Sequence, residues 1–133
     1  MAEKQFKLEI ISPDRSFYNG AATMIEYRTT EGEVGVYAGH IPMTQIIAPG
    51  VLTITEGDGT KKQAALMSGF VEILPEKISI LAETIEWPDE IDKQRAQKAK
   101  DRAEQRLKSG DNSLDMIRAE LALKRALVRL SFK

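Results

Sequence analysis

The hydrophobic period of this chain changes near residue 88. Before that point apolar side chains alternate with polar ones, as in residues 6–10, which is typical of a strand buried on one face. Beyond it, small and apolar residues recur at spacings of three and four, which is typical of helices. Pro88 ends the strand pattern because proline cannot donate to a strand ladder. We therefore predict two domains, at residues 1–87 and 88–133.

The first region contains many short strand patterns and no intervening helix pattern. We predict strands at residues 6–10, 23–29, 33–37, 45–47, 51–55, 63–68, 70–74 and 77–83. Gly57-Asp58-Gly59 predicts a tight hairpin, since glycine tolerates positive φ. Short strands without helices between them favour an antiparallel β-sandwich.

The second region predicts an antiparallel helical hairpin. Residues 90–108 and 114–130 are rich in good helix formers, and Asp89 is placed to cap the first helix. The segment Ser109-Gly110-Asp111-Asn112-Ser113 ends that helix and supplies an N-cap for the second. A short connection of this kind favours antiparallel neighbours. The fold class is therefore α+β, mainly β.

Each predicted helix carries a seam of alanines at helical spacing. The seam residues are Ala96, Ala99 and Ala103 on the first helix, and Ala119, Ala122 and Ala126 on the second. Alanine burial contributes little free energy, about one methyl group per residue, so the hairpin should be marginally stable. The later helix has a second stripe, which either packs on the sandwich or changes partners. That stripe consists of Leu114, Ile117, Leu121 and Val128.

Charge is divided unevenly along the 133 residues. Residues 1–90 hold 7 Lys and Arg against 14 Asp and Glu, whereas residues 91–133 hold 12 against 6. The basic second region should seek an acidic partner, either nucleic acid, a carboxylate-rich protein surface or a nucleoside phosphate. No apolar run approaches the roughly 18 residues of a membrane span, and no secretion signal or cysteine is present, so we expect a cytosolic chain without membrane insertion.

Catalytic and metal-binding residue sets are missing from the sequence. His40 is the only histidine, and there is no cysteine. A nucleophile or metal centre would need positioned partners of these types. We therefore expect no enzyme activity and no required metal, and we expect the loop around His40 to be structural or to contact a partner.

Three segments resemble one known family. The segment GEVGVYAGHIP at residues 32–42 is similar to a strand and loop of epsilon subunits of bacterial rotary ATP synthases. The segment RAELALKRA at residues 118–126 resembles the last helix of that family. Between them, Ile91-Asp92-x-x-Arg95-Ala96-x-x-Ala99-x-x-Arg102-Ala103 is similar to the ATP-binding motif of epsilon subunits of bacilli and their relatives. The resemblance covers nearly the whole chain.

This resemblance implies a non-catalytic subunit at the foot of a rotor. Its sandwich would contact the gamma subunit and the ring of c subunits, and the catalytic sites would lie elsewhere, between alpha and beta subunits. The implied role is coupling of proton transport to ATP synthesis. The implied location is peripheral, on the cytoplasmic face of the bacterial cell membrane, although chloroplast relatives leave a thylakoid location open.

The resemblance also implies ATP as a regulatory ligand. The implied binding residues are Glu86, Ile91, Asp92, Arg95, Ala96, Arg102, Arg125 and Arg129. Guanidinium groups suit phosphate oxygens, whereas we expect the two carboxylates to meet the adenine amino group or to orient an arginine. No glycine-rich phosphate loop is present, so binding without hydrolysis is expected. The alternative is a purely structural coupling subunit, in which Asp92 and Arg95 form only a local salt bridge.

The family resemblance further implies a two-position switch. With ATP bound the hairpin stays folded; without it the helices extend, and basic residues pair with an acidic loop of the beta subunit and block ATP hydrolysis. Those residues are Arg118, Lys124, Arg125 and Arg129. A nucleic-acid-binding adaptor is disfavoured, because acids interrupt the basic surface and no aromatic residue lies between Trp87 and Phe132.

Overall fold

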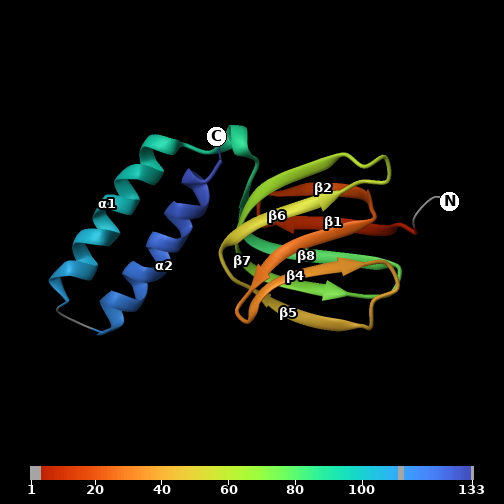
Figure 1. Cartoon of the computed structure of the whole chain (residues 1–133), viewed down its shortest axis with the longest axis horizontal. Helices are drawn as coiled ribbons and strands as arrows, with labels where there is room; N and C mark the ends of the chain where they lie inside the picture. The colour runs from red at the N-terminus through yellow and green to blue at the C-terminus, as the bar shows by residue number, and fades with distance from the viewer. Residues whose placement is uncertain (1–3, 111–112, 133) are drawn as a thin grey trace. The chain divides into compact units, whose positions relative to one another are not determined.

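The computed structural model describes residues 4–110 and 113–132. The chain forms two compact units, Met1–Trp87 and Pro88–Lys133 (Figure 1). The first unit contains the strands β1 Phe6–Ser12, β2 Arg15–Ala22, β3 Met24–Thr29, β4 Gly32–Tyr37, β5 Met43–Ile47, β6 Gly50–Thr55, β7 Lys61–Ile73 and β8 Lys77–Glu86. The second contains a 3-10 turn at Pro88–Glu90 and the helices α1 Lys93–Ser109 and α2 Ser113–Leu130. The predicted fold class, a β-sandwich followed by a helical hairpin, is confirmed.

The strands of the first unit follow the order β2-β1-β8-β7-β5-β3-β4, and β6 pairs with both β3 and β7. Strand β7 therefore has three neighbours. Its first half pairs with β6, its second half pairs with β5, and β8 runs antiparallel along most of its length. This one strand passes from one layer of the sandwich to the other.

A break in the pairing of β7 with β8 lets β7 serve both layers. The register shifts around Ser68, where Ser68 pairs with Thr84 and Gly69 pairs with Ala82. Gly69 has a φ of 134°, and a Cβ placed there would lie 2.0 Å from the carbonyl oxygen of Leu81. Only glycine fits, because both the backbone conformation and the close approach exclude a side chain.

Three details differ from the sequence-based prediction. Strand β2 was not predicted, the separate strands at residues 63–68 and 70–74 form the single strand β7, and β1 pairs with β8 in parallel within an otherwise antiparallel sheet. Strand β2 is an edge strand with only two buried side chains, Phe17 and Ala22, so it lacks a clear alternation. The β7 bulge looked like a break between strands because its residues leave the two-residue period.

The core of the sandwich is formed by alternating inward side chains. Phe6, Leu8 and Ile10 of β1 are each at most 2% exposed, in agreement with the alternation seen in the sequence. Tyr27 is fully buried, and its hydroxyl donates a hydrogen bond to the side-chain oxygen of Gln45. Burial raises the pKa of Tyr27 to about 12, which extends the range over which this hydroxyl can donate to Gln45 into alkaline pH.

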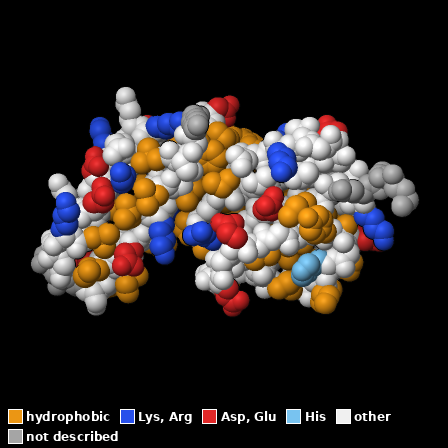
Figure 2. Space-filling view, viewed as in Figure 1, with side chains coloured by type: hydrophobic (Ala, Val, Ile, Leu, Met, Phe, Trp, Pro, Cys, Tyr) orange, Lys and Arg blue, Asp and Glu red, His pale blue; other side chains and the backbone are white. Residues whose placement is uncertain are grey.

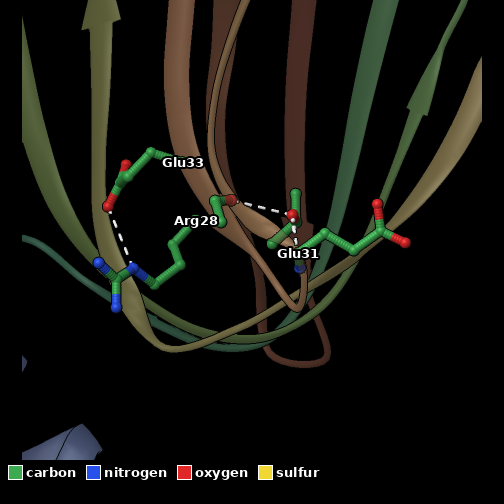
Figure 3. A network of polar contacts seen from close by, with 5 residues as sticks. Arg28, Glu31 and Glu33 are labelled. Atoms are coloured by element: carbon green, nitrogen blue, oxygen red, sulfur yellow. Dashed lines mark hydrogen bonds and ion pairs between the residues drawn. The ribbon is translucent and has the colours of Figure 1, made fainter.

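The turn between β3 and β4 is held by local polar contacts (Figure 3). The hydroxyl of Thr29 donates to the carbonyl oxygen of Gly32 at 2.9 Å and accepts from the backbone N–H of Glu31 at 3.1 Å. Arg28 Nε lies 3.1 Å from Glu33 Oε1 across the two strands. These contacts fix the entry into β4, the strand that carries the segment at residues 32–42.

The ends of the helices are set by specific caps. Asp92, rather than the predicted Asp89, caps α1: it has an extended conformation, and its side chain accepts a hydrogen bond from the backbone N–H of Arg95. Asp89 instead lies within the 3-10 turn Pro88–Glu90. Gly110 ends α1 in the left-handed conformation, as its place in the sequence predicts. The predicted cap of the second helix includes Asp111 and Asn112, which lie outside the described residues.

We predict that Gly69→Ala lowers the free energy of unfolding of the sandwich by at least about 2 kcal/mol, because the new methyl group meets the Leu81 carbonyl and the backbone must leave its positive φ. Urea unfolding followed by tryptophan fluorescence measures the change. Gly59→Ala is the matched control: Gly59 has a φ of 89°, but a Cβ there meets nothing within 4 Å. Equal losses for the two variants would contradict the close-approach argument.

Candidate nucleotide site in the helical hairpin

The residues predicted to hold ATP are divided between the two units. Glu86 is the last residue of β8, where it pairs with Ala65 in the sheet register. The other seven predicted residues belong to the second unit, from Ile91 to Arg129. The geometry within that unit is set by how α1 and α2 pack against each other (Figure 1).

The two helices meet through small side chains. Ala96 and Ala103 of α1, and Ala119 and Ala126 of α2, are each at most 3% exposed. On each helix the two buried alanines lie seven residues apart, which is two helical turns, so they share one face. The predicted seam is therefore correct at these four positions. Ala99 and Ala122, also predicted for the seam, are half-buried.

Every one of these four buried alanines follows an arginine. The pairs are Arg95-Ala96, Arg102-Ala103, Arg118-Ala119 and Arg125-Ala126. One residue is about 100° around an α-helix, so each arginine lies to one side of the seam. Because the two helices run antiparallel, the residue preceding the seam points to the same side of the hairpin on both of them. The structure therefore places four arginines along one face, which we call the arginine face.

The arginine face brings together three of the predicted site residues, Arg95, Arg102 and Arg125, and adds Arg118. None of these four side chains forms an ion pair or hydrogen bond with another residue in the described parts of the chain, 4–110 and 113–132. Arg129 follows Ala126 by three positions, which turns it toward the same side. The repeated Arg-Ala pair at a spacing of seven could have identified Arg118 from the sequence.

Asp92 contacts the backbone of α1 and not the side chain of Arg95. Its Oδ1 accepts from the backbone N–H of Arg95 at 3.0 Å, and its carbonyl oxygen accepts from the backbone N–H of Ala96 at 3.0 Å. The local salt bridge considered as an alternative for Asp92 and Arg95 is therefore wrong for this structure. Ile91 precedes the cap, is half-buried, and donates its backbone N–H to the carbonyl oxygen of Pro88 at 3.3 Å.

The sandwich has a second candidate surface, which the sequence analysis missed. Ile46 pairs with Phe70, Phe70 with Leu81, and Leu81 with Ile11, so four neighbouring strands carry one row of apolar side chains. Each of the four is 38% to 65% exposed. We call these residues the apolar row. Ile11 directly follows the buried Ile10, and this break in the alternation was the only signal in the sequence.

Helix α2 also exposes apolar side chains away from the seam. Leu114, Ile117 and Leu121 are 52%, 62% and 38% exposed, which agrees with the second stripe predicted for this helix. The fourth predicted member, Val128, is half-buried. Figure 2 shows hydrophobic side chains at the surface of the hairpin among Lys and Arg side chains. Neither helix is long and apolar enough to cross a membrane, within the residues that the structure describes.

The loop that contains His40 follows β4. Gly39 has a φ of 81°, and its backbone N–H donates to the carbonyl oxygen of Pro75 at 2.9 Å. His40 Nδ1 lies 2.8 Å from the carbonyl oxygen of Ile41. Next to it Ile41 is 77% exposed. No group of three or more potential metal ligands occurs among the described residues. The geometry is that of a shaped surface loop.

Comparison with known protein families shows to which family this chain belongs. Residues 5–88 match the family described as ATP synthase, Delta/Epsilon chain, beta-sandwich domain, and residues 89–133 match the corresponding long alpha-helix domain. The chain belongs to the ATP synthase delta/epsilon chain family. The resemblance seen in the sequence is therefore confirmed over nearly the whole chain.

Bacterial members of this family are similar to the chain over almost their full length. The ATP synthase epsilon chain of Shouchella clausii is 45% identical over 93% of this chain and 91% of the relative. That of Caldanaerobacter subterraneus subsp. tengcongensis is 43% identical over 96% of this chain and 93% of the relative. A chain in the structure of the Euglena gracilis mitochondrial ATP synthase is 29% identical, with a TM-score of 0.83, over 96% of this chain and 79% of that one.

We predict that Ala103→Leu loosens the hairpin, because a larger side chain in a close-packed seam costs about 1–3 kcal/mol. Amide hydrogen exchange of the α1 and α2 backbones measures the loss, with the amides of β7 as an internal reference. Gln105→Leu is the matched control, since this exposed residue lies on the same helix away from the seam. Equal exchange in both variants would mean that the seam does not hold the helices together.

Proposed function

We propose that this chain is a non-catalytic central-stalk subunit of a proton-translocating ATP synthase. In this proposal the sandwich couples rotation to ATP synthesis, and the hairpin is an ATP-sensitive element that restrains ATP hydrolysis. The chain would act at the cytoplasmic face of the bacterial cell membrane as a peripheral component. Membership of the delta/epsilon family and the full-length similarity to bacterial epsilon chains support the coupling role.

The apolar row supports the assignment of partners. Four exposed apolar side chains on adjacent strands form a continuous strip that is costly to leave in water. The neighbouring row on the same face is polar, with Thr44, Glu72, Ser79 and Glu9 at successive paired positions. An apolar strip with a polar edge is typical of a protein interface. In the proposed complex the gamma subunit and the c-ring cover the sandwich.

The observation that carries the regulatory proposal is the arginine face. Four guanidinium groups project from one side of the hairpin without an ionic partner among the described residues. Positive charges gathered on one face repel one another, and the alanine seam beneath them provides little compensating burial. A polyanion on this face would remove the repulsion and receive paired hydrogen bonds from the guanidinium groups. ATP meets both requirements, with Arg129 and Glu86 as further contacts expected from the family resemblance.

Nucleotide binding on this face would bias a two-state equilibrium. A ligand that binds only the folded hairpin stabilises it by an amount that grows with the logarithm of ligand concentration above the dissociation constant. When ATP is scarce, the hairpin opens, and Arg118, Lys124, Arg125 and Arg129 become available to acidic residues of the beta subunit. Hydrolysis would then be restrained when ATP is scarce. Alpha and beta subunits are therefore proposed partners of the extended form.

The second candidate is a structural coupling subunit that does not bind nucleotide. The cap made by Asp92 favours it, because the hydrogen bond to the Arg95 N–H gives this residue of the ATP motif a structural role. In that case the arginine face would serve only the acidic surface of a protein partner. The titration described below separates the two candidates.

We predict that Phe70→Asp weakens assembly with the gamma subunit and c-ring at least tenfold, because a charge would be buried in the apolar row. Phe70 is 41% exposed, so part of its side chain packs in the sheet, and urea unfolding of the isolated chain checks that the variant folds. Co-purification from the reconstituted complex measures assembly. Thr60→Asp is the control, because it adds the same charge at an exposed residue just before the start of β7, away from the apolar row. Normal assembly of the Phe70 variant would contradict this interface.

We predict saturable ATP binding by the isolated chain, weakened at least tenfold in Arg102→Ala and Arg125→Ala, because each loses charged hydrogen bonds to phosphate. Isothermal titration measures the affinity, with ADP for comparison. Lys108→Ala should bind normally, because this exposed cation of α1 lies six residues after Arg102 and so about 120° around the helix from it. Lack of binding at millimolar ATP would leave the structural candidate.

Restraint of hydrolysis is tested separately, by measuring the rate of ATP hydrolysis of the reconstituted complex. A chain ending at Trp87 should give faster ATP hydrolysis than the full chain at micromolar ATP, and a smaller difference at millimolar ATP. Equal rates with both chains would remove the inhibitory role while leaving nucleotide binding to be judged by the titration.

A further inference from the structure

The motif at residues 91–96 coincides with the start of α1. Asp92 is the N-cap, with φ −85° and ψ 97°, and Lys93 is the first helical residue. Arg95 is then the third helical residue and Ala96 the fourth. These are the two positions whose backbone N–H groups bond to an N-cap residue, one to its side chain and one to its carbonyl. The structure shows both bonds, each at 3.0 Å.

The remaining apolar position of the motif also fits a helix start. An apolar residue just before the N-cap and another at the fourth helical position form the pattern called a hydrophobic staple. Ile91 and Ala96 occupy these two positions and are half-buried and buried. The start of a helix is therefore sufficient to explain the spacing of Ile91, Asp92, Arg95 and Ala96.

We propose that Asp92 acts as a positioning residue for the anion site and not as a direct contact to nucleotide. By capping α1 it holds the first turn helical, and this turn carries Arg95 onto the arginine face and Ala96 into the seam. The proposal rests on the proposed nucleotide-binding function and assigns a different role to one residue of that site.

The first turn of α1 depends strongly on this cap. It contains no acidic residue, while Lys93 and Arg95 place two cations at the positive end of the helix dipole. Arg95 at the third position cannot return a hydrogen bond to the N-cap backbone, as a glutamate would in a capping box. Upstream, Asp89 lies in the 3-10 turn and lacks the extended conformation of a cap.

Loss of the cap would therefore displace the site without touching a ligand. If the first turn frays, Arg95 no longer has a fixed direction relative to Arg102, and Ala96 leaves the seam. The carboxylate itself need not approach ATP: its Oδ1 is already bonded to the Arg95 N–H, and its negative charge would repel phosphate.

Substitutions at position 92 can separate capping from charge. Serine and asparagine cap helices nearly as well as aspartate but are neutral, and serine is too short to replace a carboxylate contact to a ligand. Glutamate keeps the charge but is a poor cap, and alanine lacks both properties. Asp101→Ala is the matched control, because Asp101 is an exposed acid on the same helix whose side chain accepts from Gln97.

The test is isothermal titration of each full-length variant with ATP, together with hydrogen exchange of the Arg95 and Ala96 amides without ATP. We expect Asp92→Ser and Asp92→Asn to bind within about threefold of the unsubstituted chain. Asp92→Ala and Asp92→Glu should bind about fivefold or more weakly and exchange both amides faster, as loss of a cap predicts. Asp101→Ala should resemble the unsubstituted chain in both measurements.

Two results would overturn the positioning role. If Asp92→Ser binds as weakly as Asp92→Ala while its amides remain protected, the carboxylate contacts nucleotide directly. If Asp92→Ala exchanges no faster than the unsubstituted chain, the cap does not hold the first turn. Absence of ATP binding by the unsubstituted chain would instead refute the nucleotide site itself, and the amide exchange would still decide whether Asp92 holds the helix.

Discussion

The sandwich depends on the pairing of strand β7 with strands of both layers. This strand pairs with β5, β6 and β8, so both layers are connected through its thirteen residues. A regular strand could not follow both layers, and the change of direction requires the bulge around Ser68 and the positive φ of Gly69. The same bend brings Phe70 outward between Ile46 and Leu81. The apolar row is therefore a direct result of how the strand turns.

The hairpin combines weak packing with concentrated charge. Four alanines bury little surface, and each is preceded by an arginine on the same side of the hairpin. One seven-residue repeat thus sets both the helix contact and the arginine face. An insertion of one residue in either helix would turn the following alanines and arginines of that helix by about 100°, which would disrupt the helix contact and the arginine face together. Helix packing and charge placement cannot be altered independently in this unit.

Local sequence patterns predicted most of the fold but few of its long-range features. Alternation identified β1 because one face of that strand is buried, and Gly110 marked the end of α1 because a left-handed residue is needed there. The edge strand β2 gave no such signal. The sequence could not decide between Asp89 and Asp92 as the cap, since either acid can accept a backbone N–H. The apolar row depends on the register of four strands, which no local pattern contains.

The parallel pairing of β1 with β8 governs the order in which the sandwich can be completed. Lys7 pairs with Lys77, so the first strand finds this neighbour only after a loop of about seventy residues has closed. During synthesis β1 has β2 beside it but lacks its second neighbour until β8 is made. Until then the backbone groups on the free edge of β1 are unpaired and can pair with strands of other chains. The sandwich therefore cannot be completed until β8, the last of its strands in the sequence, has been made.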